Sequence, residues 1–497
     1  MMDVPRNNLR PNTFDFENLP LVTANGFREY DARWLFGKEI NLLGVQALGL
    51  GLGTYLHEVG APKVVTGHDY RSYSLSIKQA LTLGLMNAGC EVLDIGLATT
   101  PGAYYAQFAL DCPAVAMVTA SHNENGWTGV KMGANRPLTF GPDEMIRLKQ
   151  IVLGGEGKAR AGGSYKFVEN FRERYLTAVI AGHTLSRPIK VVAACGNGTA
   201  GAFAPEALRR IGAEVIPMDA ELDYTFPKYN PNPEDLHMLH SMADAVRANK
   251  ADVALGFDGD GDRCGVVDDK GEEIFADKVG VLLARDLSSR IPNAQFVVDV
   301  KSTGLYLTDP VLKKNGVRVD YWKTGHSYIK RRTAELKAVA GLEKSGHYFF
   351  NAPLGRGYDD GILAAIAVLE MLDHAGGKMS ALVASLPKTW SSPTMSPFCP
   401  DESKYDVVAA INEEYEAIKA RGEKVLGQEI VSIVTVNGMR VTLEDGTWCL
   451  VRASSNKPSL VVVVESPTSD ANMHAIFADL DGRLSKHPEV GEYDQKI

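Results

Sequence analysis

The chain is poor in cysteine and has no closely spaced cysteine pair. Its 497 residues include six cysteines, which are scattered along the sequence and lie mostly in apolar surroundings. They are Cys90, Cys112, Cys195, Cys264, Cys399 and Cys449. This pattern predicts reduced thiols and a cytoplasmic location, and no disulfide framework.

Long apolar runs and long basic runs are absent as well. No apolar stretch is long enough to cross a membrane, and residues 1–6 lack the apolar core of a signal peptide. The net charge is −9 at pH 7, and no run of lysine and arginine suits a nucleic-acid backbone. We therefore expect no membrane and no nucleic-acid partner, and an anionic substrate would need local positive charge.

Two common glycine-rich nucleotide signatures are also missing. The run 48–54 alternates leucine and glycine, but Leu56 stands where the third glycine of a dinucleotide-binding fingerprint belongs. No G-x-x-x-x-G-K-[ST] phosphate loop occurs, so no motif of the sequence supports nucleotide hydrolysis. We expect the run to form a helix that packs closely against its neighbours.

What is present is the composition of an ordinary globular protein, with a repeated pattern. At 45% hydrophobic and 23% charged residues, a chain of this length suggests three or four domains. Three segments each consist of a strand, a polar or glycine-bearing turn, a helix closed by glycine and a second strand. They span residues 63–92, 189–215 and 296–319. Such β-α-β units predict α/β domains with ligand loops at the carboxyl ends of the strands.

The last hundred residues follow a different pattern. It consists of a helical stretch at 407–420 and strand-like stretches at 431–436, 440–443 and 460–465. The predicted fold class is α/β, with three related α/β domains that have mixed sheets and a smaller α+β C-terminal domain. The predicted domains span 1–165, 166–272, 273–395 and 396–497.

A loop in the first predicted domain places a small hydroxyl beside an imidazole and an amide. The loop T-A-S-H-N at 119–123 follows an apolar run at 114–118, which predicts a buried strand. A nucleophilic serine needs such a strand end, a proton acceptor or cation, and donors for the developing anion. The alternative is that Ser121 and Asn123 only make local turn hydrogen bonds.

A second loop concentrates acidic residues. Asp258, Asp260 and Asp262 alternate with glycine and precede Arg263, again after a strand-like apolar run. Carboxylates this close repel one another unless a cation lies among them, and oxygen ligands suit Mg²⁺. An EF-hand is excluded, because its sixth position would be Arg263 in place of glycine and its twelfth Asp269 in place of glutamate. A solvated acidic turn is the alternative.

Both loops resemble signatures of the α-D-phosphohexomutase family, and the resemblance extends over most of the chain. T-A-S-H-N at 119–123 is similar to the family's active-serine signature, and D-G-D-G-D-R at 258–263 to its metal loop. The family's sugar loop, G-E-x-S-G-H, appears as L-E-K-S-G-H at 342–347, and its phosphate loop as R-A-S-S-N-K-P at 452–458. Its opening motif, F-R-x-Y-D-I-R-G, appears as F-R-E-Y-D-A-R-W at 27–34.

The resemblance implies a reaction and a metal. In the family, the serine donates a phosphoryl group to a hydroxyl of a sugar monophosphate, and the bisphosphate then turns over and returns its other phosphate to the serine. The carrier here would be Ser121, and a hexose 1,6-bisphosphate would serve as activator. Magnesium would be held by Asp258, Asp260, Asp262 and an oxygen of phosphorylated Ser121. Arg263 would bridge phosphate and carboxylate.

The resemblance also implies substrate contacts. Sugar hydroxyls that are shared by two orientations of the substrate would be bound by Glu343, Ser345 and His347, with Lys301 nearby. The distal phosphate would be bound by Arg452, Ser454, Ser455 and Asn456. The alternatives from the residues alone are a loop carboxylate that caps a turn, for Glu343, and a solvated loop, for 452–456. The candidates for the general acid and base are Lys131, His326, Arg33 and His122, and the sequence does not decide among them.

The phosphate loop indicates the subclass. Relatives that act on amino sugars usually show R-P-S-G-T-E-P, whereas the R-A-S form resembles phosphomannomutase/phosphoglucomutase members. We therefore expect reversible transfer between the 1- and 6-positions of mannose or glucose phosphate, with phosphoglucosamine mutase as the alternative. Two other classes are a non-catalytic binding module, which would lack turnover, and a serine phosphatase or hydrolase, which would release inorganic phosphate.

Overall fold

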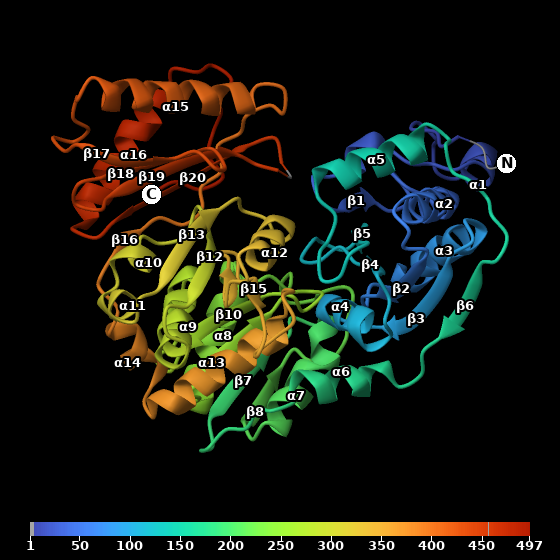
Figure 1. Cartoon of the computed structure of the whole chain (residues 1–497), viewed down its shortest axis with the longest axis horizontal. Coiled ribbons are helices and arrows are strands. Elements are labelled where there is room, and N and C mark those ends of the chain that lie inside the picture. The colour runs from blue at the N-terminus through green and yellow to red at the C-terminus, as the bar shows by residue number, and fades with distance from the viewer. Residues whose placement is uncertain (1–3, 456) are drawn as a thin grey trace.

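A computed structural model describes residues 4–455 and 457–497. Four sheets organise the described chain, and Figure 1 shows the fourth sheet on one side of the molecule and the first on the other. The predicted class, three α/β units followed by an α+β unit, is confirmed. No helix in these two ranges combines the length and apolarity that a membrane crossing requires.

The first sheet is mixed and has the order β1-β5-β4-β2-β3-β6. Its strands are β1 Ala32–Leu35, β2 Lys63–His68, β3 Glu91–Leu97, β4 Ala114–Val118, β5 Trp127–Gly133 and β6 Ser164–Phe167. The accompanying helices are α1 Phe14–Asn18, α2 Leu42–Glu58, α3 Ser74–Asn87, α4 Thr100–Ala109 and α5 Pro142–Leu153. β2 runs parallel to β3 and β4, whereas β5 is antiparallel to β4. The serine loop is therefore the β4–β5 connection.

The leucine and glycine run lies in α2, as predicted. A Cβ atom at Gly49 would lie 2.3 Å from the carbonyl oxygen of Leu81, and one at Gly84 would lie 2.1 Å from that of Gln46. These glycines let the backbones of α2 and α3 approach one another directly. The run therefore serves helix packing.

The second and third sheets repeat the crossover pattern. The second has the order β11-β10-β9-β7-β8 and the third β13-β12-β14-β15. Their strands are β7 Lys190–Ala194, β8 Glu214–Met218, β9 Val253–Phe257, β10 Cys264–Asp268, β11 Glu273–Ile274, β12 Gln295–Asp299, β13 Arg318–Trp322, β14 Ala340–Leu342 and β15 Tyr348–Phe350. Their helices are α6 Phe171–Val179, α7 Ala204–Arg210, α8 Leu236–Asn249, α9 Ala276–Arg290, α10 Leu305–Thr308, α11 Pro310–Lys314, α12 His326–Glu335, α13 Gly361–Ala375 and α14 Met379–Ala384. The parallel pairs β7·β8 and β12·β13 are the second and third predicted units.

The fourth sheet is antiparallel, with the order β16-β20-β19-β18-β17. Its strands are β16 Trp390–Ser391, β17 Ile430–Val434, β18 Met439–Leu443, β19 Trp448–Ala453 and β20 Leu460–Ser466, with helices α15 Lys404–Ala420 and α16 Asp470–Leu484. Sequence reasoning found α15, β17, β18 and β20 but missed β19 and α16. This lobe has a core of its own, from Met395 to Leu484, whereas one apolar cluster runs through the first three sheets.

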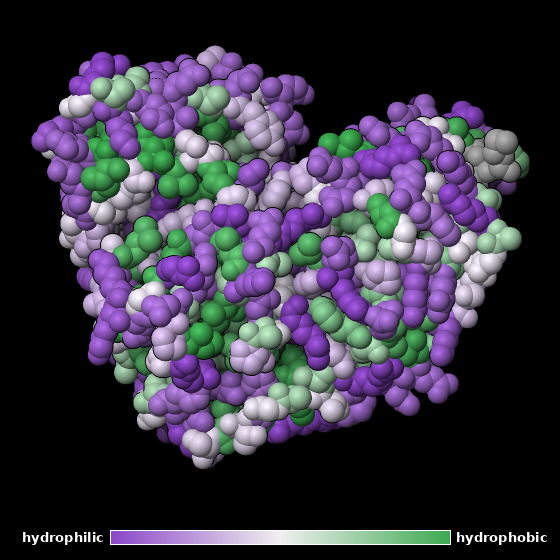
Figure 2. Space-filling model, viewed as in Figure 1, coloured by the Kyte–Doolittle hydropathy of each residue, from purple (hydrophilic) through white to green (hydrophobic). Residues whose placement is uncertain are grey.

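The six cysteines are all free and buried, as predicted. The surface is hollowed between the lobe of the fourth sheet and that of the first (Figure 2).

Candidate active site

The serine loop and the acidic loop meet at the carboxyl ends of β4 and β9. The Oγ atom of Ser121 donates a hydrogen bond to Oδ2 of Asp258 at 3.0 Å. A Cβ atom at Gly259 would lie 2.4 Å from the carbonyl oxygen of Ser121, so only glycine permits this approach. Ser121 itself has φ +50°, in the left-handed region that serine rarely adopts. Such backbone strain is typical of functional loops.

Two residues that sequence reasoning missed hold the serine loop. Asp69, directly after β2, accepts hydrogen bonds from Oγ1 of Thr119 at 2.9 Å and from the amide of Ala120 at 3.3 Å. Arg71 pairs with Asp69 and donates to the carbonyl oxygens of Ser121 at 3.0 Å and Asn123 at 2.5 Å. Both residues lie just after the carboxyl end of a parallel strand. This position could have identified them from the sequence as residues of the site.

The three predicted metal ligands are fully buried and close together. Asp258, Asp260 and Asp262 each offer an oxygen, and these atoms lie within 4.8 Å of one another. Burial and the charges of the other two carboxylates raise the pKa of Asp258 to about 7. Oδ1 of Asp260 and Oδ1 of Asp262 have no hydrogen-bond partner within the described ranges. Orphaned oxygens in a strained acidic cluster fit a hard divalent cation.

Two predicted cations, Lys131 and Arg263, border this cluster. Lys131 on β5 lies 2.9 Å from Oδ2 of Asp260 and also pairs with Asp262. Arg263 contacts Oδ2 of Asp258 through Nε at 3.0 Å. Burial opposes the charge on Lys131, but the two aspartates raise its pKa, so it stays protonated. The charges around Ser121 therefore suit an anionic group.

Arg33 on β1 also reaches the serine loop. Its guanidinium pairs with Asp31 at 2.8 Å and donates to the carbonyl oxygen of Thr119 at 3.4 Å. Its neighbour Trp34 stands where the family motif has glycine. Trp34 is buried and donates from Nε1 to the carbonyl oxygen of Thr23 at 2.9 Å, a packing that the absence of a side chain at Gly26 permits.

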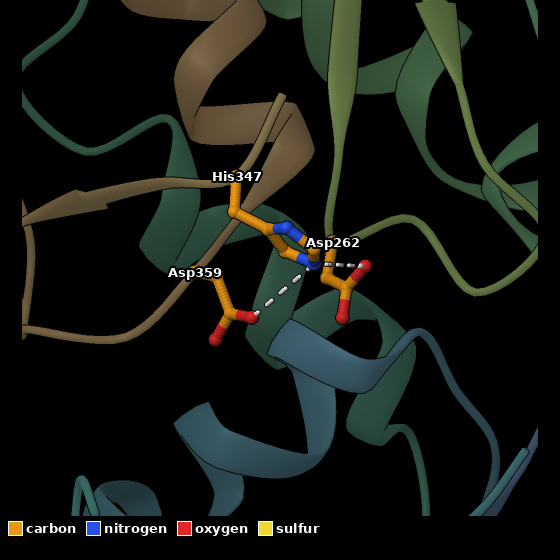
Figure 3. Close-up of side chains that lie close together, drawn as sticks. All are labelled: Asp262, His347 and Asp359. Carbon is orange, nitrogen blue, oxygen red and sulfur yellow. Dashed lines mark ion pairs between the residues drawn. The ribbon is translucent and has the colours of Figure 1, made fainter. Parts of the chain in front are cut away.

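The sugar loop lies against the acidic loop. The amide of Cys264 donates to the carbonyl oxygen of Gly346 at 3.0 Å. Nε2 of His347 lies 3.5 Å from Oδ1 of Asp262 and 3.9 Å from Oδ2 of Asp359, as Figure 3 shows. Its Nδ1 lies 3.1 Å from Oε2 of Glu343.

These carboxylates determine the charge of His347. Burial opposes protonation, but Asp262 and Glu343 raise the pKa of His347 to about 10. His347 is therefore an imidazolium at neutral pH and a hydrogen-bond donor. Ser345 contacts the same ring, with Oγ 3.0 Å from Nδ1. Asp359, which sequence reasoning did not include in the site, also pairs with the buried Lys330 at 2.9 Å.

His326, at the start of α12, has the opposite character. Burial and the nearby charges of Lys330 and Lys131 lower the pKa of His326 well below its usual value. Neither ring nitrogen has a hydrogen-bond partner among residues 4–455 and 457–497. Its ring centre lies 6.1 Å from that of His347. His326 is therefore a neutral imidazole at physiological pH, and its nitrogens can bond to a ligand.

Two further predicted residues, Lys301 and His122, lie near the sugar loop and the serine. Lys301 is buried just after β12, where its backbone amide donates to Oδ1 of Asp299 at 2.9 Å. Its charge helps to lower the pKa of Glu343, although burial acts in the opposite direction. His122 is exposed, and its Nδ1 lies 3.3 Å from Oγ of Ser121.

The phosphate loop begins in the last two residues of β19, Arg452 and Ala453, on the fourth lobe. Arg452 is buried, donates from Nη1 to the carbonyl oxygen of Ala453 at 2.9 Å and has no partner for Nε within the described chain. Burial lowers the pKa of Arg452, while charges that include Asp299 and Glu343 of the third lobe oppose this. The backbone oxygen of Ser454 accepts a hydrogen bond from Lys404 at 2.6 Å, and Ser455 follows in the same loop. Asn456 lies outside the described residues.

Comparisons with known proteins match the chain to four family models in succession. Models of the phosphoglucomutase/phosphomannomutase α/β/α domains I, II and III match residues 24–157, 166–271 and 275–390, and that of the C-terminal domain matches 399–483. The chain is 35% identical over 451 residues to a phosphomannomutase/phosphoglucomutase of Pseudomonas putida, covering 90% of this chain and 93% of that protein. The chain belongs to the phosphoglucomutase/phosphomannomutase family.

Other members of the family resemble this chain in sequence and in structure. A phosphomannomutase/phosphoglucomutase of Pseudomonas aeruginosa is 33% identical, over 91% of this chain and 94% of its own length. A crystal structure of a phosphoglucomutase/phosphomannomutase family protein from Burkholderia thailandensis superposes with a TM-score of 0.84 at 29% identity, over 94% of this chain and 98% of that one. A probable phosphoglucosamine mutase of Methanothermobacter thermautotrophicus is 30% identical, over 88% of this chain and 93% of its own length.

The residues predicted for the site come from all four lobes of the chain. The first contributes Arg33, Ser121 and Lys131, the second the aspartates, the third the sugar loop and the fourth Arg452. The arrangement offers one cation-lined position at Ser121 and a separate arginine on the fourth lobe. It is chemically suited to a substrate with two anionic ends.

Proposed function

We propose that this family member interconverts hexose 1-phosphates and 6-phosphates, with mannose and glucose phosphates as substrates. Phosphorylated Ser121 and a hexose 1,6-bisphosphate would be the intermediates. The observation that carries the proposal is the hydrogen bond of 3.0 Å between Ser121 and Asp258 in a cluster flanked by Lys131 and Arg263. The names of the Pseudomonas relatives support the substrate class. Reduced cysteines support a cytoplasmic location.

Magnesium is the metal that we propose for the acidic loop. The ligands are Asp258, Asp260, Asp262 and an oxygen of phosphorylated Ser121, and the unpartnered Oδ1 of Asp260 in the described chain supports this choice. When bound, the ion offsets negative charge on the phosphoryl group. Lys131 and Arg263 add fixed positive charge on the protein side of the same group.

Transfer breaks the bond between phosphorus and Oγ of Ser121, which takes up a proton, and forms one to a sugar hydroxyl, which loses its proton. His326 is the acceptor that we propose, because its imidazole is neutral at physiological pH and its ring nitrogens are unpartnered in the described chain. Lys131 stays charged and stabilises the transferring group. Arg33 holds the serine loop through Thr119 and adds a further cation.

The sugar must bind alike in two orientations. His347 as a donor, with Glu343, Ser345 and Lys301, would contact hydroxyls that both orientations share. The phosphate that is not reacting would lie on Arg452, Ser454, Ser455 and Asn456. After the bisphosphate turns over, the steps run in reverse and Ser121 recovers a phosphoryl group.

An isomerisation assay tests this function. Mannose, glucose and glucosamine 1-phosphates are supplied separately with Mg²⁺ and a trace of the matching bisphosphate, and 6-phosphates and inorganic phosphate are measured. We expect isomerisation of the mannose and glucose compounds. Faster turnover of the glucosamine compound would favour the phosphoglucosamine mutase alternative, which the name of the Methanothermobacter relative supports. Release of inorganic phosphate without isomerisation would indicate a phosphatase.

A further inference from the structure

The first residue of α4 reaches from the first lobe to the acidic loop of the second. Thr100 is buried, and its Oγ1 atom donates a hydrogen bond to Oδ2 of Asp260 at 2.5 Å. Its backbone amide donates to the carbonyl oxygen of Asp260 at 2.9 Å. Thr100 therefore holds both the main chain and the side chain of one proposed magnesium ligand, from 160 positions away in the sequence.

These contacts use one oxygen of the Asp260 carboxylate and leave the other open. Oδ2 also accepts a hydrogen bond from Nζ of Lys131 at 2.9 Å, whereas Oδ1 is buried and has no hydrogen-bond partner within residues 4–455 and 457–497. A carboxylate that is held by two donors on one oxygen presents its second oxygen in a fixed direction. Oδ1 is therefore the oxygen of Asp260 that is available to a cation.

The two donors to Oδ2 differ in how firmly they fix its position. Lys131 divides its charge between Asp260 and Asp262, and its long side chain can follow either carboxylate. The hydroxyl of Thr100 stands on a short, branched side chain at the start of a helix, where both backbone and rotamer are restricted. Thr100 thus sets the position of the carboxylate, while Lys131 balances its charge.

The preceding threonine provides a comparison within the same helix. Thr99 is equally buried and is the N-cap of α4, where its Oγ1 accepts a hydrogen bond from the amide of Gly102 at 3.2 Å. Its methyl group packs against the acidic loop, since a Cβ atom at Gly261 would lie 3.1 Å from Cγ2 of Thr99. Of the two hydroxyls, only that of Thr100 bonds to an aspartate of the loop in the described part of the chain.

We propose that Thr100 is a positioning residue for the divalent cation, because its hydroxyl holds Asp260 so that Oδ1 faces the metal. The proposal rests on the magnesium site of the proposed function and extends it to a residue that does not touch the ion. Partners that orient a ligating side chain in this way typically contribute about tenfold to a hundredfold to metal affinity. Without the hydroxyl, the carboxylate can turn Oδ1 toward Lys131, and the ligand geometry is lost.

Calorimetric titration of Mg²⁺ into the metal-free protein tests this role. Thr100→Val keeps the shape of the side chain but removes the donor, and it should weaken Mg²⁺ binding at least tenfold. Thr100→Ala should do the same as a second variant, and Thr100→Ser should bind nearly as tightly as the wild type. The Mg²⁺ concentration for half-maximal turnover should rise by the same factor as the dissociation constant. All preparations are compared at equal phosphorylation of Ser121, measured by intact mass.

The matched control is Thr99→Val, which removes a buried hydroxyl one position earlier and keeps the methyl group that packs on Gly261. It should lower the melting temperature, because α4 loses its N-cap, but it should leave Mg²⁺ affinity unchanged. Circular dichroism of each metal-free variant shows that the fold is retained.

Three outcomes would overturn the proposal. Unchanged Mg²⁺ affinity in Thr100→Val and Thr100→Ala would refute the role of Thr100 and leave the magnesium site intact. An equal loss of affinity in Thr99→Val, or no recovery in Thr100→Ser, would mean that looser packing of α4 causes the loss. Absence of Mg²⁺ binding by the wild type would instead refute the metal of the proposed function, and this role with it.

Discussion

At the scale of single residues, Ser121 is where strain and charge coincide. Its backbone has φ +50°, and its hydroxyl is bound to a carboxylate whose pKa is raised to about 7 by burial and by its neighbours. A residue with only a turn role would not need an acidic cluster beside it. The strain is therefore best explained by positioning of Oγ.

Two substitutions separate the chemistry of Ser121 from its conformation. Ser121→Ala and Ser121→Gly should both abolish turnover, because both remove the carrier oxygen. Ser121→Gly should be more stable than Ser121→Ala by about 1 kcal/mol, since glycine adopts positive φ without strain. Intact-mass and peptide mapping should find phosphate on Ser121 of the wild type only. Full turnover by the alanine variant, with no phosphate ever found on Ser121, would show that the serine serves only the local turn.

The acidic loop makes a second prediction at this scale. Chelation of divalent ions should abolish turnover, and addition of Mg²⁺ should restore it. Asp260→Asn should weaken metal affinity at least tenfold, about 1.4 kcal/mol, because one of three oxygen ligands loses its charge. The metal-free variant should stay folded, since Lys131 keeps Asp262 as a partner. Circular dichroism and metal titration measure both effects, and activity that survives thorough chelation would refute the assignment.

At the scale of elements, the sequence predicted those strands that directly precede a recognisable motif. β4 and β9 were found because short apolar runs precede the serine and acidic loops. β19 was missed because the sequence from Arg452 onward was interpreted only as a loop. α16 was missed although Met473, Ile476, Phe477 and Leu480 recur with helical spacing and are buried.

The cap of α13 gives a prediction about pH. The side chain of Asp360 accepts hydrogen bonds from the amides of Ile362 and Leu363, yet burial raises its pKa to about 7. The pKa in the folded state thus exceeds that of the unfolded chain, so this group favours folding below the unfolded value of about 3.9. Its contribution is lost as pH rises from about 4 to about 7.

Asp360→Asn isolates this contribution, because asparagine can cap the helix without ionising. The difference in unfolding free energy between wild type and variant should shift with pH, in favour of the variant, by on the order of 1–4 kcal/mol between pH 4 and pH 7. Urea unfolding of both proteins across this range provides the measurement. Parallel pH profiles would mean that Asp360 ionises normally.

Arg452, near the end of β19, should serve both substrates alike. Arg452→Ala should raise the KM for the 1-phosphate and for the 6-phosphate together, since a lost charged hydrogen bond costs about 1.5–3 kcal/mol. This corresponds to roughly a tenfold to a hundredfold change. Steady-state kinetics in both directions test it. A defect confined to one direction would show that Arg452 does not bind the shared distal phosphate.

At the scale of the whole molecule, the sequence predicted the loops but not what holds them together. Asp69 and Arg71 support Ser121 from about fifty positions away, and Lys330 pairs with Asp359 between distant segments. Local periodicity does not reveal such contacts, because they join segments that come together only when each lobe folds. The predicted domain limits stay a proposal, which limited proteolysis at 387–400 can test.

One buried arginine contributes to the contact between the third and fourth lobes, beside Glu465, which accepts hydrogen bonds from Thr303 and Gly304. The guanidinium carbon of Arg440 on β18 lies 3.7 Å from the centre of the Trp448 ring and 4.4 Å from that of Tyr321. Its Nη1 donates to the carbonyl oxygens of Val300 at 2.7 Å and Ser302 at 2.6 Å. Removing it leaves both oxygens buried without their donor, at a cost of about 1–3 kcal/mol each.

Arg440→Met should therefore loosen the fourth lobe and misplace Arg452. We expect KM to rise at least tenfold for both phosphates, while kcat falls less, because Ser121 and the acidic loop lie on other lobes. Cleavage by proteases in 387–400 should accelerate. The matched control is Arg483→Met, since Arg483 lies 4.5 Å from the centre of the Tyr415 ring but pairs only within the fourth lobe. If the control variant raised KM as much as Arg440→Met, the effect would come from instability of the lobe itself and the coupling between the lobes would be refuted.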